Sequence, residues 1–210
     1  MSTISMKRAV LLFCPMAAAS VLALLTIASA GDAAPRYTVV TKSFSNTAAI
    51  EIPDSGQTTP YPSEIGVSGL RGGIIRDVNL TLNGFSHTFP DDVDVLLIGP
   101  QGQNAIVMSD VGGGTDVSNI ILKLDDAATA ALPDKDQLQS RSYQPNNHGP
   151  DGADAFPDPA PAPRGGESLA VFNGTLPNGT WRLFVVDDAA RDIGEIAGGW
   201  TLKIKAKVRR

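Results

Sequence analysis

The chain has 210 residues, 42% of them hydrophobic, with 17 lysines and arginines against 22 aspartates and glutamates, and a formal net charge of −5. This length and apolar content predict one domain with its own core, while the acidic balance disfavours nucleic acid and anionic membranes as partners and suits divalent cations. The single cysteine, Cys14, excludes a framework of intrachain disulfides.

The N-terminal residues have the pattern of a secretory signal peptide. Lys7 and Arg8 precede an uncharged stretch, residues 9–27, that closes on three small residues. We therefore predict a leader over 1–30 that is cleaved before Gly31, and a secreted or periplasmic protein without membrane contact after cleavage. The net charge becomes −7 once Lys7 and Arg8 are removed. The alternative is a retained membrane anchor, because the apolar stretch approaches spanning length.

Short β-branched runs recur between scattered glycines and prolines, which is typical of an all-β sandwich or barrel. Apolar and polar residues alternate over 74–85, as in a half-buried antiparallel strand. The alternation is cleanest over 199–208, where Thr201 and three lysines occupy one face, and this lysine-rich face would guard against edge-to-edge association. The other candidate strands, weaker toward the start, are 37–44, 48–52, 64–70, 93–99, 105–110, 118–124, 168–172 and 180–187.

These segments predict an antiparallel β-sandwich of about nine or ten strands with one short helix. The helix is predicted over 125–132, with Asp125 as its N-cap. The absence of alternating strand and helix patterns argues against a parallel α/β sheet. Residues 133–167 are rich in proline and poor in aliphatic side chains, which predicts a long surface loop with polyproline-like segments. Tyr143 and Phe156 are expected to pin this loop to the sandwich.

The chain lacks the usual parts of nucleophilic catalysis. Its only imidazoles are His87 and His148, there is no G-x-S-x-G elbow, and Cys14 is expected to leave with the leader. We interpret His87 as a structural residue that bonds across a turn to Asp91 or Asp92. No catalytic or cofactor-binding residue is therefore assigned, and we predict that the chain is not an enzyme.

Acidic residues gather at two places in the sequence. Asp187, Asp188 and Asp192 lie within six residues just after an apolar run, and a second group lies within 91–94. Ca²⁺ takes several oxygen ligands from carboxylates and carbonyls on loops, so the first group is a candidate structural calcium site. The alternative is that these acids accept backbone N–H bonds within the turn. No EF-hand pattern is present.

An ordered series of short motifs organises the second half of the chain. The series is His87, Asp92-Val93, Gly99-Pro100-x-Gly102, Phe172-Asn173-Gly174, Asn178-Gly179-Thr180-Trp181, Asp187, and Asp192-x-Gly194 followed by Trp200. Its order and spacing resemble the P domain, also called the Homo B domain, of subtilisin-like proprotein convertases and their bacterial relatives, over about residues 45–208. Gly99 departs from the serine that this family usually has.

The resemblance implies a jelly-roll-type, galactose-binding-domain-like sandwich with Trp181 and Trp200 in its core. Its role in the family is non-catalytic: it supports the folding, stability and calcium or pH response of an attached serine endopeptidase. The expected division is the leader, an N-terminal extension over 31–45 that is too short for a protease, and a P-domain-like sandwich over 46–210.

We therefore expect a free-standing, secreted binding or stabilising module, linked to proteolysis through its family. Its expected partner is a separately encoded protease, or a cell-surface protein or glycan. The alternative is a calcium-assisted carbohydrate-binding or cell-surface adhesion module, because jelly rolls often bind glycans near Ca²⁺.

Overall fold

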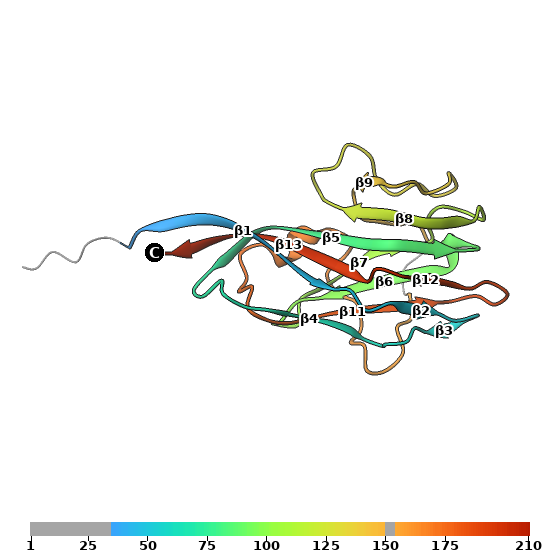
Figure 1. The fold of residues 1–210 in the computed structure, drawn as a ribbon, viewed down its shortest axis with the longest axis horizontal. Coiled ribbons are helices and arrows are strands. Elements are labelled where there is room, and N and C mark those ends of the chain that lie inside the picture. The colour runs from blue at the N-terminus through green and yellow to red at the C-terminus, as the bar shows by residue number, and fades with distance from the viewer. Residues whose placement is uncertain (1–34, 150–153) are drawn as a thin grey trace, which may run out of the picture. The chain divides into compact units, whose positions relative to one another are not determined.

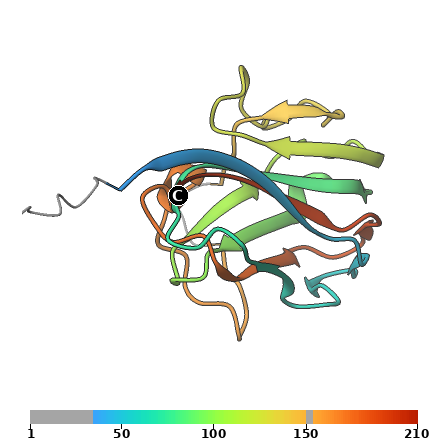
Figure 2. The ribbon, with the colours of Figure 1, turned by 60° about the vertical axis from the view of Figure 1, so that its left-hand side comes forward.

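The computed structural model describes residues 35–149 and 154–210, and the predicted leader with Cys14 lies outside these residues (Figure 1). The described residues form thirteen strands and two short 3₁₀ helices, η1 (Pro90–Asp92) and η2 (Leu169–Phe172). The strands make two sheets that pack against each other as a sandwich, which confirms the predicted all-β class (Figures 1 and 2). Among the described helices, neither has the length or apolar character needed to span a bilayer.

The larger sheet has seven strands, and β13 lies in its interior between β1 and β5. Its members are β1 (Tyr37–Asn46), β2 (Ile50–Ile52), β5 (Ile74–His87), β8 (Val117–Leu124), β9 (Arg141–Tyr143), β12 (Gly194–Ile196) and β13 (Trp200–Arg209). β1 is antiparallel to β13 along its whole length, from Tyr37 opposite Arg209 to Asn46 opposite Trp200. The first part of β5 pairs with β13, and its second part pairs with β8 and β12.

The smaller sheet has six strands, and β6 lies between β7 and β11. Its members are β3 (Gly56–Gln57), β4 (Ser63–Val67), β6 (Val93–Ile98), β7 (Asn104–Ser109), β10 (Asn146–Asn147) and β11 (Gly179–Asp187). β11 pairs on its other side with β4 and then with β3. Most pairings are antiparallel as predicted, whereas the short strands β9 and β10 pair in parallel with β8 and β7.

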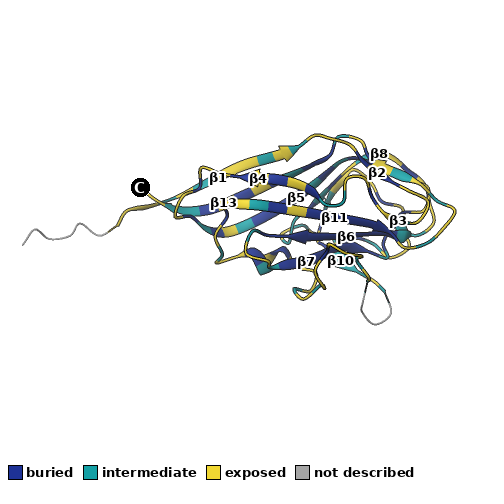
Figure 3. Cartoon of the chain, turned by 90° about the horizontal axis from the view of Figure 1, so that it is seen from below, coloured by how far each residue is buried: buried dark blue, intermediate teal, exposed yellow. Residues whose placement is uncertain are grey.

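The main core lies between the two sheets. Trp181 of β11 and Trp200 of β13 are both fully buried, so their predicted core positions are confirmed. The Trp200 Nε1–H donates to Ser63 Oγ at 2.8 Å and so joins β13 to β4 of the opposite sheet. The alternation along β13 follows from this packing, because its inward residues are buried and its outward lysines face solvent (Figure 3).

A second, smaller apolar cluster lies on the outer side of the six-stranded sheet. Phe184 and Ile98 point away from the main core and are covered by Ala160, Tyr61 and Phe156. This cover explains why β6 and β7 are buried along their full length rather than alternating (Figure 3). The proline-rich segment is thus held against the sheet by Phe156, as predicted.

The structure corrects three expectations about secondary structure. Residues 125–132 form no helix, because the Asp125 carboxylate accepts the Ala127 N–H at 3.0 Å and closes a local turn instead. The strand predicted over 168–172 is the 3₁₀ helix η2. β13 is an interior strand, so its lysines do not guard an edge.

Two expectations about the start of the domain and about its long loop also change. The segment expected to be an extension, 31–45, supplies most of β1, so the sandwich starts at Tyr37 rather than at residue 46. Within 133–167, Tyr143 is buried in β9, so this segment contributes strands as well as the predicted loop.

Candidate functional site

Aspartates that are distant in the sequence gather at one end of the six-stranded sheet. β11 is antiparallel to β6, so Asp187 lies opposite Val93 at the start of β6. β7 runs antiparallel on the other side of β6 and brings its last residue, Ser109, to Asp94. The resulting acidic cluster comprises Asp91, Asp92, Asp94, Asp110, Asp154, Asp187, Asp188 and Asp192.

Three members of the acidic cluster are close enough to share one ion. Carboxylate oxygens of Asp94, Asp110 and Asp154 lie within 4.8 Å of one another, the one such group among residues 35–149 and 154–210. Asp154 is positioned by the Asn147 side-chain amide, which donates to its Oδ2 at 2.6 Å. Converging carboxylate oxygens are the donor set of a hard divalent cation such as Ca²⁺, which takes about six to eight oxygen ligands.

A shared hydroxyl links two of these three acids. Ser109 Oγ lies 2.6 Å from Asp94 Oδ1 and 3.0 Å from Asp110 Oδ2. A hydroxyl has one hydrogen to donate, so satisfying both contacts without a cation requires a proton on one of the two carboxyl groups. The buried member, Asp94, is the group that takes this proton most easily.

Burial and mutual repulsion raise the pKa values across the acidic cluster. Burial raises the pKa of Asp94 to about 8, the hydrogen bond from Ser109 opposes this shift, and the charges of Asp154, Asp188 and Asp110 add to it. Burial likewise raises the pKa of Asp92 to about 6, with Asp187 as the next contribution. The cluster therefore holds its negative charges at a cost, which a bound cation would relieve.

The three acids of the predicted calcium site all lie near Asp92, because the charge of each one raises the pKa of Asp92, but they are not among the described acids whose oxygens converge within 4.8 Å. Asp187 is buried, and its Oδ2 lies 3.1 Å from His87 Nε2 while its Oδ1 accepts the Ala189 N–H at 3.1 Å. Asp192 Oδ1 accepts a hydrogen bond from Thr88 Oγ1 at 2.9 Å. The turn-stabilising alternative thus describes Asp187, and Asp188 is the member of the trio that faces Asp110 and Asp154.

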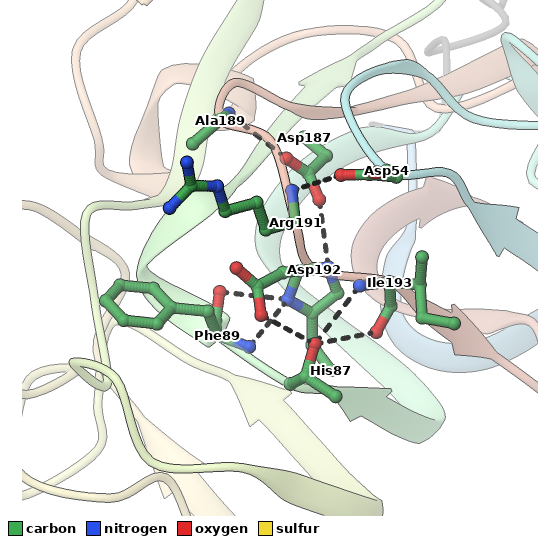
Figure 4. Close-up of polar contacts among 9 residues, drawn as sticks. Asp54, His87, Phe89, Asp187, Ala189, Arg191, Asp192 and Ile193 are labelled. Atoms are coloured by element: carbon green, nitrogen blue, oxygen red, sulfur yellow. Dashed lines mark hydrogen bonds and ion pairs between the residues drawn. The ribbon is translucent and has the colours of Figure 1, made fainter.

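His87 lies in a fully buried corner between the two sheets (Figure 4). Its Nδ1 lies 2.9 Å from the Phe89 carbonyl oxygen, and its Nε2 faces Asp187 rather than either acid of η1, which corrects the predicted partner. A Cβ atom on Gly194 would lie 2.3 Å from His87 Cδ2, so glycine is required there. Both ring nitrogens are engaged, so His87 is a structural residue.

The sequence contains no local signal for the centre of the acidic cluster. Asp94 belongs to the 91–94 group, whereas Asp110 has no acidic neighbour in the sequence and Asp154 lies between Asp151 and Asp158 of the proline-rich segment. Strand pairing brings Asp110 to Asp94, and Asn147 of β10 brings Asp154. One sequence pattern could have pointed to the cluster. The neighbouring strands β11, β6 and β7 each contain or directly precede an aspartate at the same end of the sheet.

No protein-family model and no curated protein sequence matches the chain. Two solved structures are similar to it. The serine protease of Aeromonas sobria in complex with its chaperone has a TM-score of 0.39 and 14% identity, over 84% of this chain and 28% of that chain. The serine protease of Aeromonas sobria alone has a TM-score of 0.39 and 16% identity, over 81% of this chain and 27% of that chain. The chain thus spans just over a quarter of those proteins.

Proposed function

We propose that the protein is an exported, non-catalytic, P-domain-like module that binds and stabilises a separately encoded serine-type protease. The observation that supports this proposal is that motif residues far apart in the sequence contact one another and join the two sheets. His87 contacts Asp187 and packs on Gly194, while Asn178 Oδ1 accepts the Leu70 N–H at 3.1 Å. Motif residues whose contacts join the two sheets support a scaffold role rather than a reaction centre.

The environment of His87 supports the non-catalytic part of this proposal. A general base must reach the proton that it abstracts, directly or through one water. The His87 side chain is fully buried and is already bonded to Asp187 and to the Phe89 backbone. It is therefore unable to receive a proton from a bound substrate without disruption of the corner.

A capture experiment tests for the protease partner. The chain from Gly31 onward is immobilised and exposed to culture medium of the organism that encodes this chain. We expect retention of a protein that reacts with a fluorophosphonate probe, which labels active serine hydrolases. Addition of the module should raise the melting temperature of that protein, since a partner at about 100 times its Kd stabilises by about 2.7 kcal/mol.

A Trp200→Ala variant, expected to be destabilised, is the matched control for capture. If none of the proteins retained by the immobilised chain reacted with the fluorophosphonate probe, the proposal would be contradicted. Calcium-dependent binding on a glycan array, together with that negative result, would instead support the carbohydrate-binding alternative.

We further propose that Asp94, Asp110 and Asp154 hold a structural Ca²⁺ ion. The supporting observations are the convergence of their oxygens within 4.8 Å and the burial of Asp94. Bound calcium would supply positive charge to a group of acids that otherwise repel one another. The remaining ligands would be carbonyl or water oxygens, and Asp188 is near enough to add to the field at the site.

Without calcium, the melting temperature is expected to fall as the pH rises from about 5 to about 8. Asp94 has an ordinary value of 3.8 when unfolded and a pKa of about 8 when folded, so the folded state binds more protons in this window and loses stability as pH rises. Thermal melts in EDTA measure this fall, for which 1 kcal/mol corresponds to about 2–4 °C. Millimolar Ca²⁺ should abolish it.

The Asp94→Asn variant should flatten this pH dependence and lose the response to Ca²⁺. Asp116→Asn, which removes an exposed carboxylate, is the matched control and should behave like the unmodified chain. A melting temperature that rises over the same pH window in EDTA would refute the role of Asp94. A response to Ca²⁺ that survives in Asp94→Asn would refute the site.

A further inference from the structure

Positive charge is concentrated at the end of the sandwich where β1 begins and β13 ends. The segments 35–42, 65–76 and 203–210 contain nine lysines and arginines and no aspartate or glutamate, although the chain as a whole is acidic. β1 and β13 pair directly, and Gly73 in the second segment packs on Val208 of β13. Figure 1 shows β1 and β13 side by side at this end.

The cations of β13 form a regular row on the outer face of the seven-stranded sheet. Lys203, Lys205, Lys207 and Arg209 alternate with buried residues, so they share this face at a spacing of about 7 Å. Asp77 of β5 stands opposite Lys205, so one carboxylate adjoins the row. In the described part of the chain, no ion pair within 4.0 Å involves any of the four cations. Since β13 is an interior strand, the row has no role in blocking an edge.

Two exposed apolar side chains lie beside this row. Tyr37 stands opposite Arg209 and Val39 opposite Lys207 on β1, so they point to the same face. Their exposed fractions are 52% and 56%, and the Lys207 ammonium lies 4.4 Å from the centre of the Tyr37 ring. The basic face, defined as the β13 row from Lys203 to Arg209 with Tyr37 and Val39, thus combines positive charge with exposed apolar surface.

We propose that the basic face docks the sandwich on an anionic phospholipid surface. Rows of lysine and arginine bind anionic head groups, while aromatic and aliphatic side chains enter the interface between head groups and acyl chains. A soluble acidic polymer would use the cations but would not require Tyr37 and Val39 to be exposed.

This inference is independent of the protease partner, because the acidic cluster and the His87 corner lie on other elements. It also revises the expectation drawn from net charge. A global charge of −5 disfavours anionic surfaces only if the charges are evenly mixed, and here nine of the 17 lysines and arginines lie in the three segments at one end of the sandwich.

Vesicle binding of the chain from Gly31 tests the proposal. All thirteen strands lie within one compact unit, Pro35–Arg210, and a thermal melt confirms that each variant is folded. We expect sedimentation with phosphatidylcholine vesicles that contain about 30% phosphatidylglycerol, none with phosphatidylcholine alone, and loss of binding in high salt. Lys205→Gln with Lys207→Gln should weaken binding about 30-fold, at about fivefold for each cation near the surface.

The matched control pair, Lys135→Gln with Arg182→Gln, removes two charges elsewhere and should change binding by less than about twofold. Tyr37→Ser with Val39→Ser should weaken vesicle binding while leaving binding to soluble dextran sulfate unchanged. Equal losses for the two charge pairs, or no preference for anionic vesicles, would overturn the proposal. Binding to dextran sulfate without binding to vesicles would also overturn it and would assign the face to an acidic polymer.

Discussion

Replacement of Trp200 by alanine is expected to lower the free energy of unfolding by about 3–5 kcal/mol, because the side chain is fully buried between the sheets. The change removes a large apolar group and also the 2.8 Å hydrogen bond to Ser63 that joins the two sheets. A loss of this size lowers the melting temperature by about 6–20 °C in a domain of this length. Circular dichroism during heating or urea titration measures it.

Trp200→Phe separates the two contributions, since it keeps most of the apolar volume and removes only the donor. We expect it to cost about 1–2 kcal/mol, the range for a lost buried hydrogen bond with a small change in packing. Val39→Ala, at an exposed site, should cost less than about 0.5 kcal/mol. An unchanged melt for Trp200→Ala would refute the placement of this residue in the core.

His87→Ala is expected to destabilise the fold by a similar amount, about 3–5 kcal/mol, because it leaves the buried Asp187 carboxylate without its partner. The two side chains are fully buried and their polar atoms are 3.1 Å apart. Removal of one member leaves a desolvated polar group, whereas the double variant His87→Ala with Asp187→Ala removes both. The double variant should therefore lose less than the sum of the single losses, as a double-mutant cycle in urea would show.

The exposed ion pair of Arg182 and Glu64 provides the comparison. Its polar atoms are 3.0 Å apart, yet both side chains are about half exposed, so Glu64→Ala should cost no more than about 1 kcal/mol. If His87→Ala proved as mild as Glu64→Ala, the corner would have no stabilising role. The motif resemblance would then lose its physical explanation.

Patterns of period two predicted the strands well because each records which face is buried. The alternation in β13 and the apolar run of β6 reflect one covered face and two covered faces, respectively. The 168–172 run was assigned to a strand because four apolar residues are too few to define a period. Its buried residues, Leu169 and Phe172, are three positions apart, which is the spacing of the 3₁₀ turn that forms.

The candidate site was predicted only in part, because its contacts cross long sequence distances. His87 and Asp187 are 100 positions apart, and no property of either segment specifies the pairing. Asp94, Asp110 and Asp154 meet through the register of β6, β7 and β10, which the sequence does not reveal without the fold. The acids predicted to bind calcium are adjacent in sequence, whereas the three acids whose oxygens converge within 4.8 Å come from three segments.

The pairing of β1 with β13 has a consequence for how the chain reaches its folded state. Residue 37 meets residue 209, so the larger sheet closes only after nearly the whole polypeptide has left the ribosome. Such non-local closure is entropically costly and makes folding slow, on a scale of about milliseconds to seconds. A nascent chain therefore has no partner for its first strand until synthesis is almost finished, and the exposed edge of that strand must be kept from pairing with other chains in the meantime.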